Sequence, residues 1–441
     1  MSVRKVMLLA IALACVGAAS IAFAQDTVTI TYWSSASPEE AGFEEQIIAE
    51  FEQAHPNVSV DMEFGAGDWG EMHTQILVRM AAGTAPDVIM TPSDWVRTFA
   101  LAEQGGFLDL APYMERDGLD PSALFYGVYN VGVVDGTPFV LTKDYSTTAI
   151  YINTDLFDEA GIPYPEEGWT WDDFIAVAQK LTLDANGNDA TSPDFDSENI
   201  VQWGAFVPPK FGPAFSDLAY SYGAQELSDD GSTAIGYLDS EPMAQAFEMW
   251  RDMLHKYHIA PSMAQIQAQP GVDLFADGQA AMRGPWGTWN IPTYAESPGL
   301  NFLVVALPTG PEGHYGTVCW MGYGVNKDSD HPDQAWELLK WLATEPGQLV
   351  FSQMALTSMP AVAEETGKAM DPYWGPFLAE SDHIYPAMDS NKVTVYYQCV
   401  GSELDNLRGL LRSDEGAGVD PRPLLKDIAL KAEECLAQAG S

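Results

Sequence analysis

Residues 28 to 91 alternate between two kinds of segment, and this alternation limits the folds open to the chain. Three short runs are rich in β-branched and aromatic residues and predict strands: 28–33, 58–64 and 87–91. Between them, an apolar stripe from Phe43 to Phe51 and a second apolar run over 69–82 predict two helices. Strand, helix, strand, helix, strand is the order of a parallel sheet with helices on its faces, so we expect an α/β fold.

The loops that follow these strands are expected to meet at one edge of the sheet, where α/β folds bind their ligands. The polar and aromatic candidates in these loops are Ser35, Ser37, Trp69 and Asp94. A carboxylate at Asp94 can accept hydrogen bonds from two sugar hydroxyls. It can equally cap a helix predicted over 95–103, because Asp is among the residues preferred at that position. Both interpretations stay open.

The N-terminus has the pattern of a secretory signal: Arg4 and Lys5, an apolar run from Val6 to Ala14, and Ala22-Phe23-Ala24 before the expected cleavage site. The alternative, a lipid anchor on Cys15, has a leucine one place too late for the usual lipobox. Without residues 1–24, the chain of 441 residues is still too long for one ordinary core. We therefore expect an exported protein with two or more lobes.

The formal net charge of −43 excludes some partners. A field of this sign repels nucleic acid and anionic lipid, so neither is expected to bind. The sequence carries no phosphate-binding loop, dinucleotide fingerprint, G-x-S-x-G elbow or zinc-ligand cluster, so we predict no cofactor and no metal. The paired carboxylates of a glycoside hydrolase stay open, because sequence does not give their separation. Outside the signal, Cys319, Cys399 and Cys435 allow at most one internal disulfide, whose pairing also stays open.

Residues 275–290 (FADGQAAMRGPWGTWN) place two tryptophans in a frame of glycine and proline. Gly284 and Gly287 let the backbone turn, and the proline between them fixes one φ angle. The frame predicts that Trp286, and less strongly Trp289, is held without a helix or long strand to bury it and can stack on a sugar ring. The alternative is that both indoles belong to a core, where large aromatic side chains usually lie.

Five stretches together resemble the extracellular solute-binding proteins of ABC importers, in the carbohydrate-type group that includes maltose-binding and glycerol-3-phosphate-binding proteins. They are TITYW at 29–33, GTAPDVIM at 83–90, AIYINTDLF at 149–157, FADGQAAMRGPWGTWN at 275–290 and GYGVNKDSDHPDQAWELLKWL at 322–342. The resemblance implies a two-lobed periplasmic-binding-protein fold of type II, with two parallel-sheet lobes joined by hinge crossings. Lobe 1 would hold 25–142 with 322–345, and lobe 2 would hold 143–321 with 346–441.

The resemblance also implies the crossings and the ligand contacts. The chain would cross near Thr142 to Tyr145, near Gly316 to Gly324 and near Glu345 to Val350. The first two segments are hinge candidates from the sequence itself, because Lys143-Asp144 interrupts one extended run and four glycines interrupt the other, over 313–325. The residues that match or lie near ligand-contacting positions of the family are Trp286, Ser35, Ser37, Asp94, Tyr145, Ser146, Phe211, Tyr396 and Tyr397.

Arg283 stands just before Gly-Pro-Trp, where neutral residues are usual in the family. A cation there leaves open a charged ligand, such as a sugar acid or a phosphate. An arginine paired with a carboxylate is the alternative. The function expected from the whole sequence is a monomeric, non-enzymatic protein that captures a sugar or oligosaccharide between two lobes and delivers it to a membrane permease. A secreted glycoside hydrolase is the second hypothesis.

Overall fold

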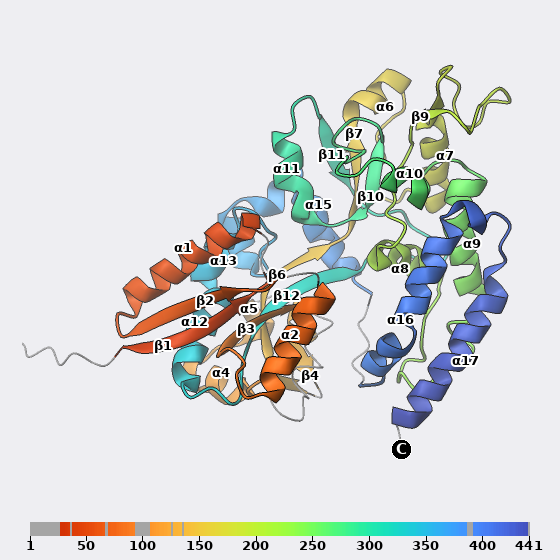
Figure 1. Cartoon of the computed structure of the whole chain (residues 1–441). Coiled ribbons are helices and arrows are strands. Elements are labelled where there is room, and N and C mark those ends of the chain that lie inside the picture. The colour runs from red at the N-terminus through yellow and green to blue at the C-terminus, as the bar shows by residue number, and fades with distance from the viewer. Residues whose placement is uncertain are drawn as a thin grey trace, which may run out of the picture.

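The computed structural model describes residues 27–35, 38–66, 69–92, 106–124, 127–134, 136–385 and 391–439. Two regions, each with a sheet and its own helices, are joined by extended strands (Figure 1). The expected two-lobed α/β fold is confirmed. The signal segment, Ser37, Asp94 and the helix predicted over 95–103 lie outside the described residues, and so does the side chain of Trp69.

The first region is built on a five-stranded sheet in the order β2-β1-β3-β12-β6. Its strands are β1 (Val28–Ser34), β2 (Val58–Phe64), β3 (Val88–Pro92), β6 (Val140–Thr147) and β12 (Val318–Val325). The three strands predicted at the start of the chain are present, and β1 pairs in parallel with both β2 and β3. The sheet is nevertheless mixed, because β12 runs antiparallel to β3 and β6.

Helices α1 (Pro38–Ala54), α2 (Trp69–Ala81), α4 (Ala111–Asp117), α12 (Pro332–Ala343) and α13 (Glu345–Phe351) belong to the first region. Phe51 of α1, Trp336 of α12 and Phe351 of α13 share one buried core with the strands of this sheet. Since α13 packs on α1 and α12, the crossing expected near Glu345 to Val350 does not occur there. The sequence does not show which helices α13 packs against, so it could not assign this segment to a region.

The second region contains a three-stranded sheet in the order β10-β7-β11, formed by β10 (Met282–Trp286), β7 (Ala149–Asn153) and β11 (Phe302–Val305). Both pairings are antiparallel, so the expectation of a parallel sheet in this lobe is wrong. A helical connection, η3 (Thr288–Asn290) and α11 (Ile291–Glu296), does join β10 to β11. These two strands run in the same direction, but β7 lies between them and runs the opposite way.

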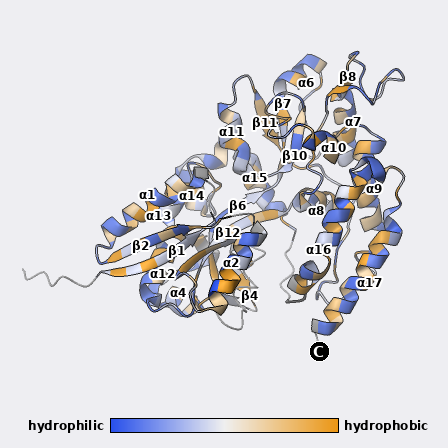
Figure 2. Ribbon diagram, viewed as in Figure 1, coloured by the Kyte–Doolittle hydropathy of each residue, from blue (hydrophilic) through white to orange (hydrophobic). Residues whose placement is uncertain are grey.

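Besides α11, seven helices of the described residues belong to this region: α6 (Thr154–Ala160), α7 (Trp171–Leu181), α8 (Gly212–Ser221), α9 (Glu241–His255), α10 (Met263–Gln267), α16 (Asn391–Leu411) and α17 (Pro421–Ala439). Helix α7 begins with a capping box, in which Thr170 and Asp173 are the two members. Apolar and polar residues form stripes along the helices (Figure 2). In α9 the apolar stripe includes Phe247 and Trp250, and both are buried.

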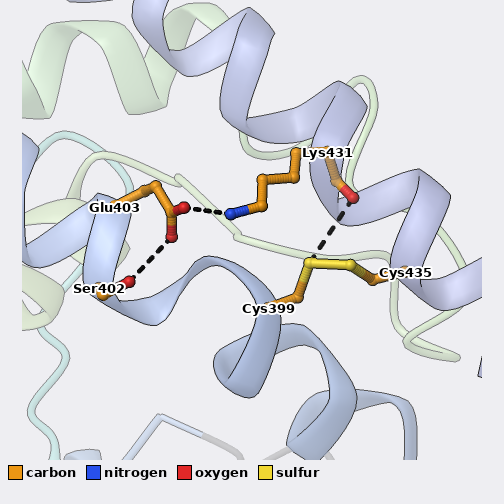
Figure 3. The surroundings of a disulfide bond; sticks show 5 residues. All are labelled: Cys399, Ser402, Glu403, Lys431 and Cys435. Atoms are coloured by element: carbon orange, nitrogen blue, oxygen red, sulfur yellow. Dashed lines mark hydrogen bonds and ion pairs between the residues drawn. A yellow bond between two sulfur atoms is a disulfide. The ribbon is translucent and has the colours of Figure 1, made fainter.

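The C-terminal helices α16 and α17 lie side by side and are joined by a disulfide between Cys399 and Cys435 (Figure 3). The same pair of helices is linked by the ion pair of Lys431 with Glu403. Cys319 does not take part in a disulfide. The disulfide pairing that the sequence leaves open is therefore 399 with 435. None of the described helices is both long enough and apolar enough to cross a membrane.

Three passages connect the two regions. In the first, β6 leads into β7 with only Thr148 between them, and in the second, residues 306–317 lead from β11 into β12. The third comes after α13, through α14 (Pro360–Glu365) and α15 (Gly375–Ala379) towards α16. Helix α15 packs on β6, so the three passages lie close together.

Candidate ligand-binding site

Three aromatic residues from two distant segments meet on the second region. Phe211 precedes α8, Trp286 ends β10 and Trp289 lies in η3. The ring centroids of Phe211 and Trp286 are 4.7 Å apart, and those of Trp286 and Trp289 are 5.2 Å apart with an angle of 70° between the planes. Trp289 is 42% exposed, whereas Trp286 is half-buried. We call these three residues the aromatic cluster.

Glycine makes the backbone around the aromatic cluster possible, at two positions and for two reasons. Gly284 has φ of 131°, a conformation that other residues rarely adopt, and its backbone approaches the carbonyl oxygen of Ala149. Gly287 instead provides room, because a Cβ atom there would lie 1.9 Å from the nearest ring atom of Trp289. The segment before Trp286 is a short strand, β10, rather than the loop that the sequence suggested.

Two buried side chains hold this backbone in place. The hydroxyl of Tyr151 donates a hydrogen bond of 2.7 Å to the carbonyl oxygen of Gly287. The backbone N–H of Thr288 donates to Oγ of Ser146 over 2.8 Å, and Ser146 in turn donates to the carbonyl oxygen of Thr147. Ser146, a candidate ligand contact in the sequence, is therefore buried and occupied in supporting the tryptophans.

Arg283 is buried behind Trp286 and paired with a carboxylate. Its Nη1 lies 2.8 Å from Oδ2 of Asp273, and its side chain is only 7% exposed. The hydroxyl of Tyr294 donates to the same carboxylate oxygen over 2.8 Å. The guanidinium carbon lies 4.3 Å from the ring centroid of Trp286, a cation–π contact. Of the two interpretations left open by the sequence, the paired arginine is the one that the structure shows.

The other predicted contacts fall into different environments. Ser35 is buried, and its Oγ has no hydrogen-bond partner among the described residues. Tyr145 is buried and its hydroxyl lies 2.8 Å from Oγ of Ser381. Tyr396 is fully buried in the core of the second region, so its nomination as a ligand contact is wrong, whereas Tyr397 is 48% exposed. Adjacent residues on a helix point in different directions, and the inward stripe of α16 includes Tyr396.

A buried ion cluster lies where β6 passes α1. Nζ of Lys143 is 2.5 Å from Oδ2 of Asp144 and 3.1 Å from Oε1 of Glu40. Burial alone would lower the pKa of Lys143, but the carboxylates of Asp144, Glu40 and Glu44 outweigh it and raise the pKa. Burial also raises the pKa of Glu44 to about 7. The hydroxyl of Tyr32 donates to Glu44 over 3.1 Å.

Two further carboxylates, which the sequence did not single out, hold the passages in place: Asp217 binds two of them to the second region, and Glu380, which follows α15, binds the third passage to the second passage. Asp217 of α8 accepts hydrogen bonds of 2.7 Å from the hydroxyl of Thr148 and from the backbone N–H of Thr317. Burial raises the pKa of Asp217 to about 7. Glu380 accepts from the backbone N–H of Leu307, and its other oxygen lies 2.7 Å from Nε2 of His314. This hydrogen bond raises the pKa of His314.

The sequence profile of bacterial extracellular solute-binding proteins matches residues 35–349. The chain belongs to this family. An ABC substrate-binding protein of Listeria monocytogenes, solved with cycloalternan, has 24% identity and a TM-score of 0.74, with 94% of this chain and 100% of that chain covered. The sugar-binding protein MalE of Xanthomonas citri has 21% identity and a TM-score of 0.76, covering 94% and 98%.

UgpB of Mycobacterium tuberculosis, solved with glycerophosphocholine, has 16% identity and a TM-score of 0.78, covering 94% and 100% of the two chains. At these identities the likeness concerns the fold. It confirms, for this extracellular solute-binding protein, the two-lobed architecture that the sequence motifs implied.

Proposed function

We propose that this solute-binding protein captures a sugar or oligosaccharide between its two regions and delivers it to the membrane permease of an ABC importer. The observation that carries the proposal is the aromatic cluster, which lies beside the strands that join the two regions. Indole faces suit the apolar C–H face of a sugar ring, while polar groups at the rim bind its hydroxyls. The sugar-binding neighbours from Listeria and Xanthomonas support the same ligand class.

A neutral ligand is favoured over a sugar acid or a glycerol phosphate. The cation that contacts the ring of Trp286, Arg283, already pairs with Asp273 and is almost fully buried. An anion would have to displace this carboxylate and would meet a strongly negative chain. The glycerophosphocholine bound by UgpB nevertheless makes such ligands worth including in the test.

The protein would act by closing around its ligand. A sugar that contacts both regions stabilises the closed arrangement, and the passages allow the regions to rotate without changing their cores. We expect the residues 1–24 to direct export, and the mature protein to act as a monomer outside the cytoplasm. Ser35, Ser37, Trp69 and Asp94 are the proposed contacts from the first region. Tyr145 on the first passage and Tyr397 on α16 are further proposed contacts.

A thermal-shift screen with neutral mono- and oligosaccharides, sugar acids and glycerophosphocholine tests the proposal. A ligand at about 100 times its Kd should add roughly 2.7 kcal/mol to the free energy of unfolding. Solution scattering should then show a smaller radius of gyration in the presence of that ligand. A chain that no sugar stabilises would contradict the proposal. Appearance of shortened oligosaccharides during incubation would instead support the glycoside hydrolase.

A further inference from the structure

We propose that Trp289 provides the main open ring face of the site and selects ligands with two or more sugar rings. This inference rests on the proposed function and specifies it further. It differs from the sequence prediction, which favoured Trp286 as the stacking residue. The structure assigns Trp286 to a supported inner position and Trp289 to an outer one.

The ring of Trp286 already has several neighbours. The guanidinium of Arg283 lies 4.3 Å from its centroid, and the ring of Phe211 lies 4.7 Å from it. Its Nε1 donates a hydrogen bond of 2.7 Å to Oδ1 of Asn290. These contacts fix the indole and cover part of its surface, which agrees with its half-buried state.

Trp289 is fixed in place but left open. One side of its ring lies against the backbone of Gly287, where a Cβ atom would come within 2.5 Å of three ring atoms. The rings of Trp286 and Phe211 approach it with interplanar angles of 70° and 78°. The residue remains 42% exposed despite these contacts. A large apolar side chain that is both exposed and held by its neighbours is characteristic of a binding surface.

The angle between the two indoles determines the shape of ligand that fits them. Their planes are 70° apart with centroids only 5.2 Å from each other. One flat sugar ring cannot stack on both planes at once, so a single ring would use only one of them. Two linked rings can contact both indoles, provided that the linkage bends between them. The chemical class that fits is therefore an oligosaccharide with a bent linkage.

The test compares the full-length parent with Trp289→Ala and Trp289→Phe by calorimetric titration. The probes are maltotriose, cellotriose, xylotriose and arabinotriose, each beside its own monosaccharide. We expect the parent to bind at least one trisaccharide more tightly than the matching monosaccharide. Trp289→Ala should weaken that trisaccharide about tenfold or more, which corresponds to the loss of one stacked ring. It should change monosaccharide binding by less than about twofold, and Trp289→Phe should restore most of the trisaccharide affinity.

Gly287→Ala provides a second variant, because its Cβ displaces the Trp289 ring without deleting it. It should lower trisaccharide affinity as Trp289→Ala does. Tyr164→Ala is the matched control, since Tyr164 is also exposed but contacts Phe157 rather than the aromatic cluster. Its affinity should equal that of the parent, and the melting temperature of each variant reports folding.

The outcomes separate the two proposals. If the parent binds a trisaccharide and Trp289→Ala binds it equally well, the inference is overturned and the proposed function stands. An equal loss for trisaccharide and monosaccharide would overturn the selection for two rings, and so would a parent that binds only monosaccharides. If the parent binds none of these seven probes, while also failing the wider screen, the proposed function falls and the inference falls with it.

Discussion

Strands β6 and β12 lie side by side and both connect the two regions. Polar groups of β6 bind the first region, whereas a polar group at the start of β12 binds the second. On β6, the side chains of Lys143 and Asp144 form an ion cluster with Glu40 of α1, in the first region. At the start of β12, the N–H of Thr317 binds Asp217 of α8, in the second region. The same pair of strands is therefore anchored to the first region at one end and to the second at the other.

This difference limits the expected hinge to fewer residues than the two segments that the sequence suggested. Asp144 is fixed to the first region, while the next-but-one residue, Ser146, binds the backbone of Thr288 in the second. On β12, pairing with β3 begins at Met321, and Thr317 is already bound to α8. The bend is thus expected around Tyr145 on β6 and over residues 318–320 on β12. Residues 318–320 pair with residues 145–147 of β6, and the two segments form a two-stranded ribbon.

An irregularity in the pairing lies at the boundary of this ribbon. Met321 pairs with Asp144 and Gly322 pairs with Thr142, so the register shifts and Lys143 has no opposite residue. A bulge of this kind bends a strand and redirects the side chain of the extra residue. It explains how the ammonium group of Lys143 reaches the carboxylates beside α1 from the middle of a buried strand.

Removing the charge at Lys143 is expected to have the largest effect. Lys143→Met would leave Asp144 and Glu40 as unpaired carboxylates in a buried site, which typically lowers the free energy of unfolding by about 3–5 kcal/mol. Chemical denaturation measures the loss. Lys327→Met is the matched control, because Lys327 pairs with Asp328 on the surface and should change stability by less than about 0.5 kcal/mol. Equal losses in the two variants would show that the buried cluster has no special role.

Two glycines, Gly316 in the second passage and Gly324 in β12, allow a finer test. A Cβ on Gly324 would lie 2.7 Å from ring atoms of Phe107, whereas the nearest atom to a Cβ on Gly316 would be the end of the Leu307 side chain, at 3.1 Å. Gly324→Ala should therefore lower the free energy of unfolding by about 1–3 kcal/mol through overpacking. Gly316→Ala should change it by less than about 0.5 kcal/mol. If both variants lost the same stability, glycine would be needed here for backbone freedom rather than for room.

The sequence predicted the first region well because its signals are local. The apolar stripe of α1 and the alternating residues of β2 each lie within a short segment of the chain. The frame of Gly284 and Gly287 likewise predicted a constrained pair of tryptophans. Strand direction in the second region was not predictable in this way, since β7 is placed between β10 and β11 only by long-range pairing.

The remaining parts of the site depend on the folded arrangement. Lys143 and Asp144 look like a polar interruption in the sequence, and only the position of α1 shows that they are buried. Asp217 and Glu380 stand among 63 acidic residues with no local pattern to mark them. Phe211 was chosen from a loose resemblance, and its contact with Trp286 joins segments that are far apart in the chain.

Asp217 gives the smallest expected effect, and it concerns pH. Burial raises its pKa to about 7 in the folded protein, while in an unfolded chain an aspartate has a pKa near 4. Between these values the folded state holds a proton that the unfolded state has released. The stability due to this proton is complete below pH 4 and is lost as the pH rises through 7. His314, whose pKa is also raised, contributes in the same direction.

Asp217→Asn should therefore flatten the fall in stability between pH 6 and pH 8 by about 1 kcal/mol, because the amide does not titrate and still offers an acceptor to the N–H of Thr317. A slope remains, since His314 and the repulsion among surface carboxylates are unchanged. Denaturation curves across this pH range measure the difference, with the exposed Asp328→Asn as the control. Parallel curves for the parent and Asp217→Asn would mean that this carboxylate is already ionised where it binds the two passages. Asp217 would then be an ionised carboxylate, like those of the Lys143 cluster. The two ends of the ribbon would be held by groups of the same charge state and would not differ in their response to pH.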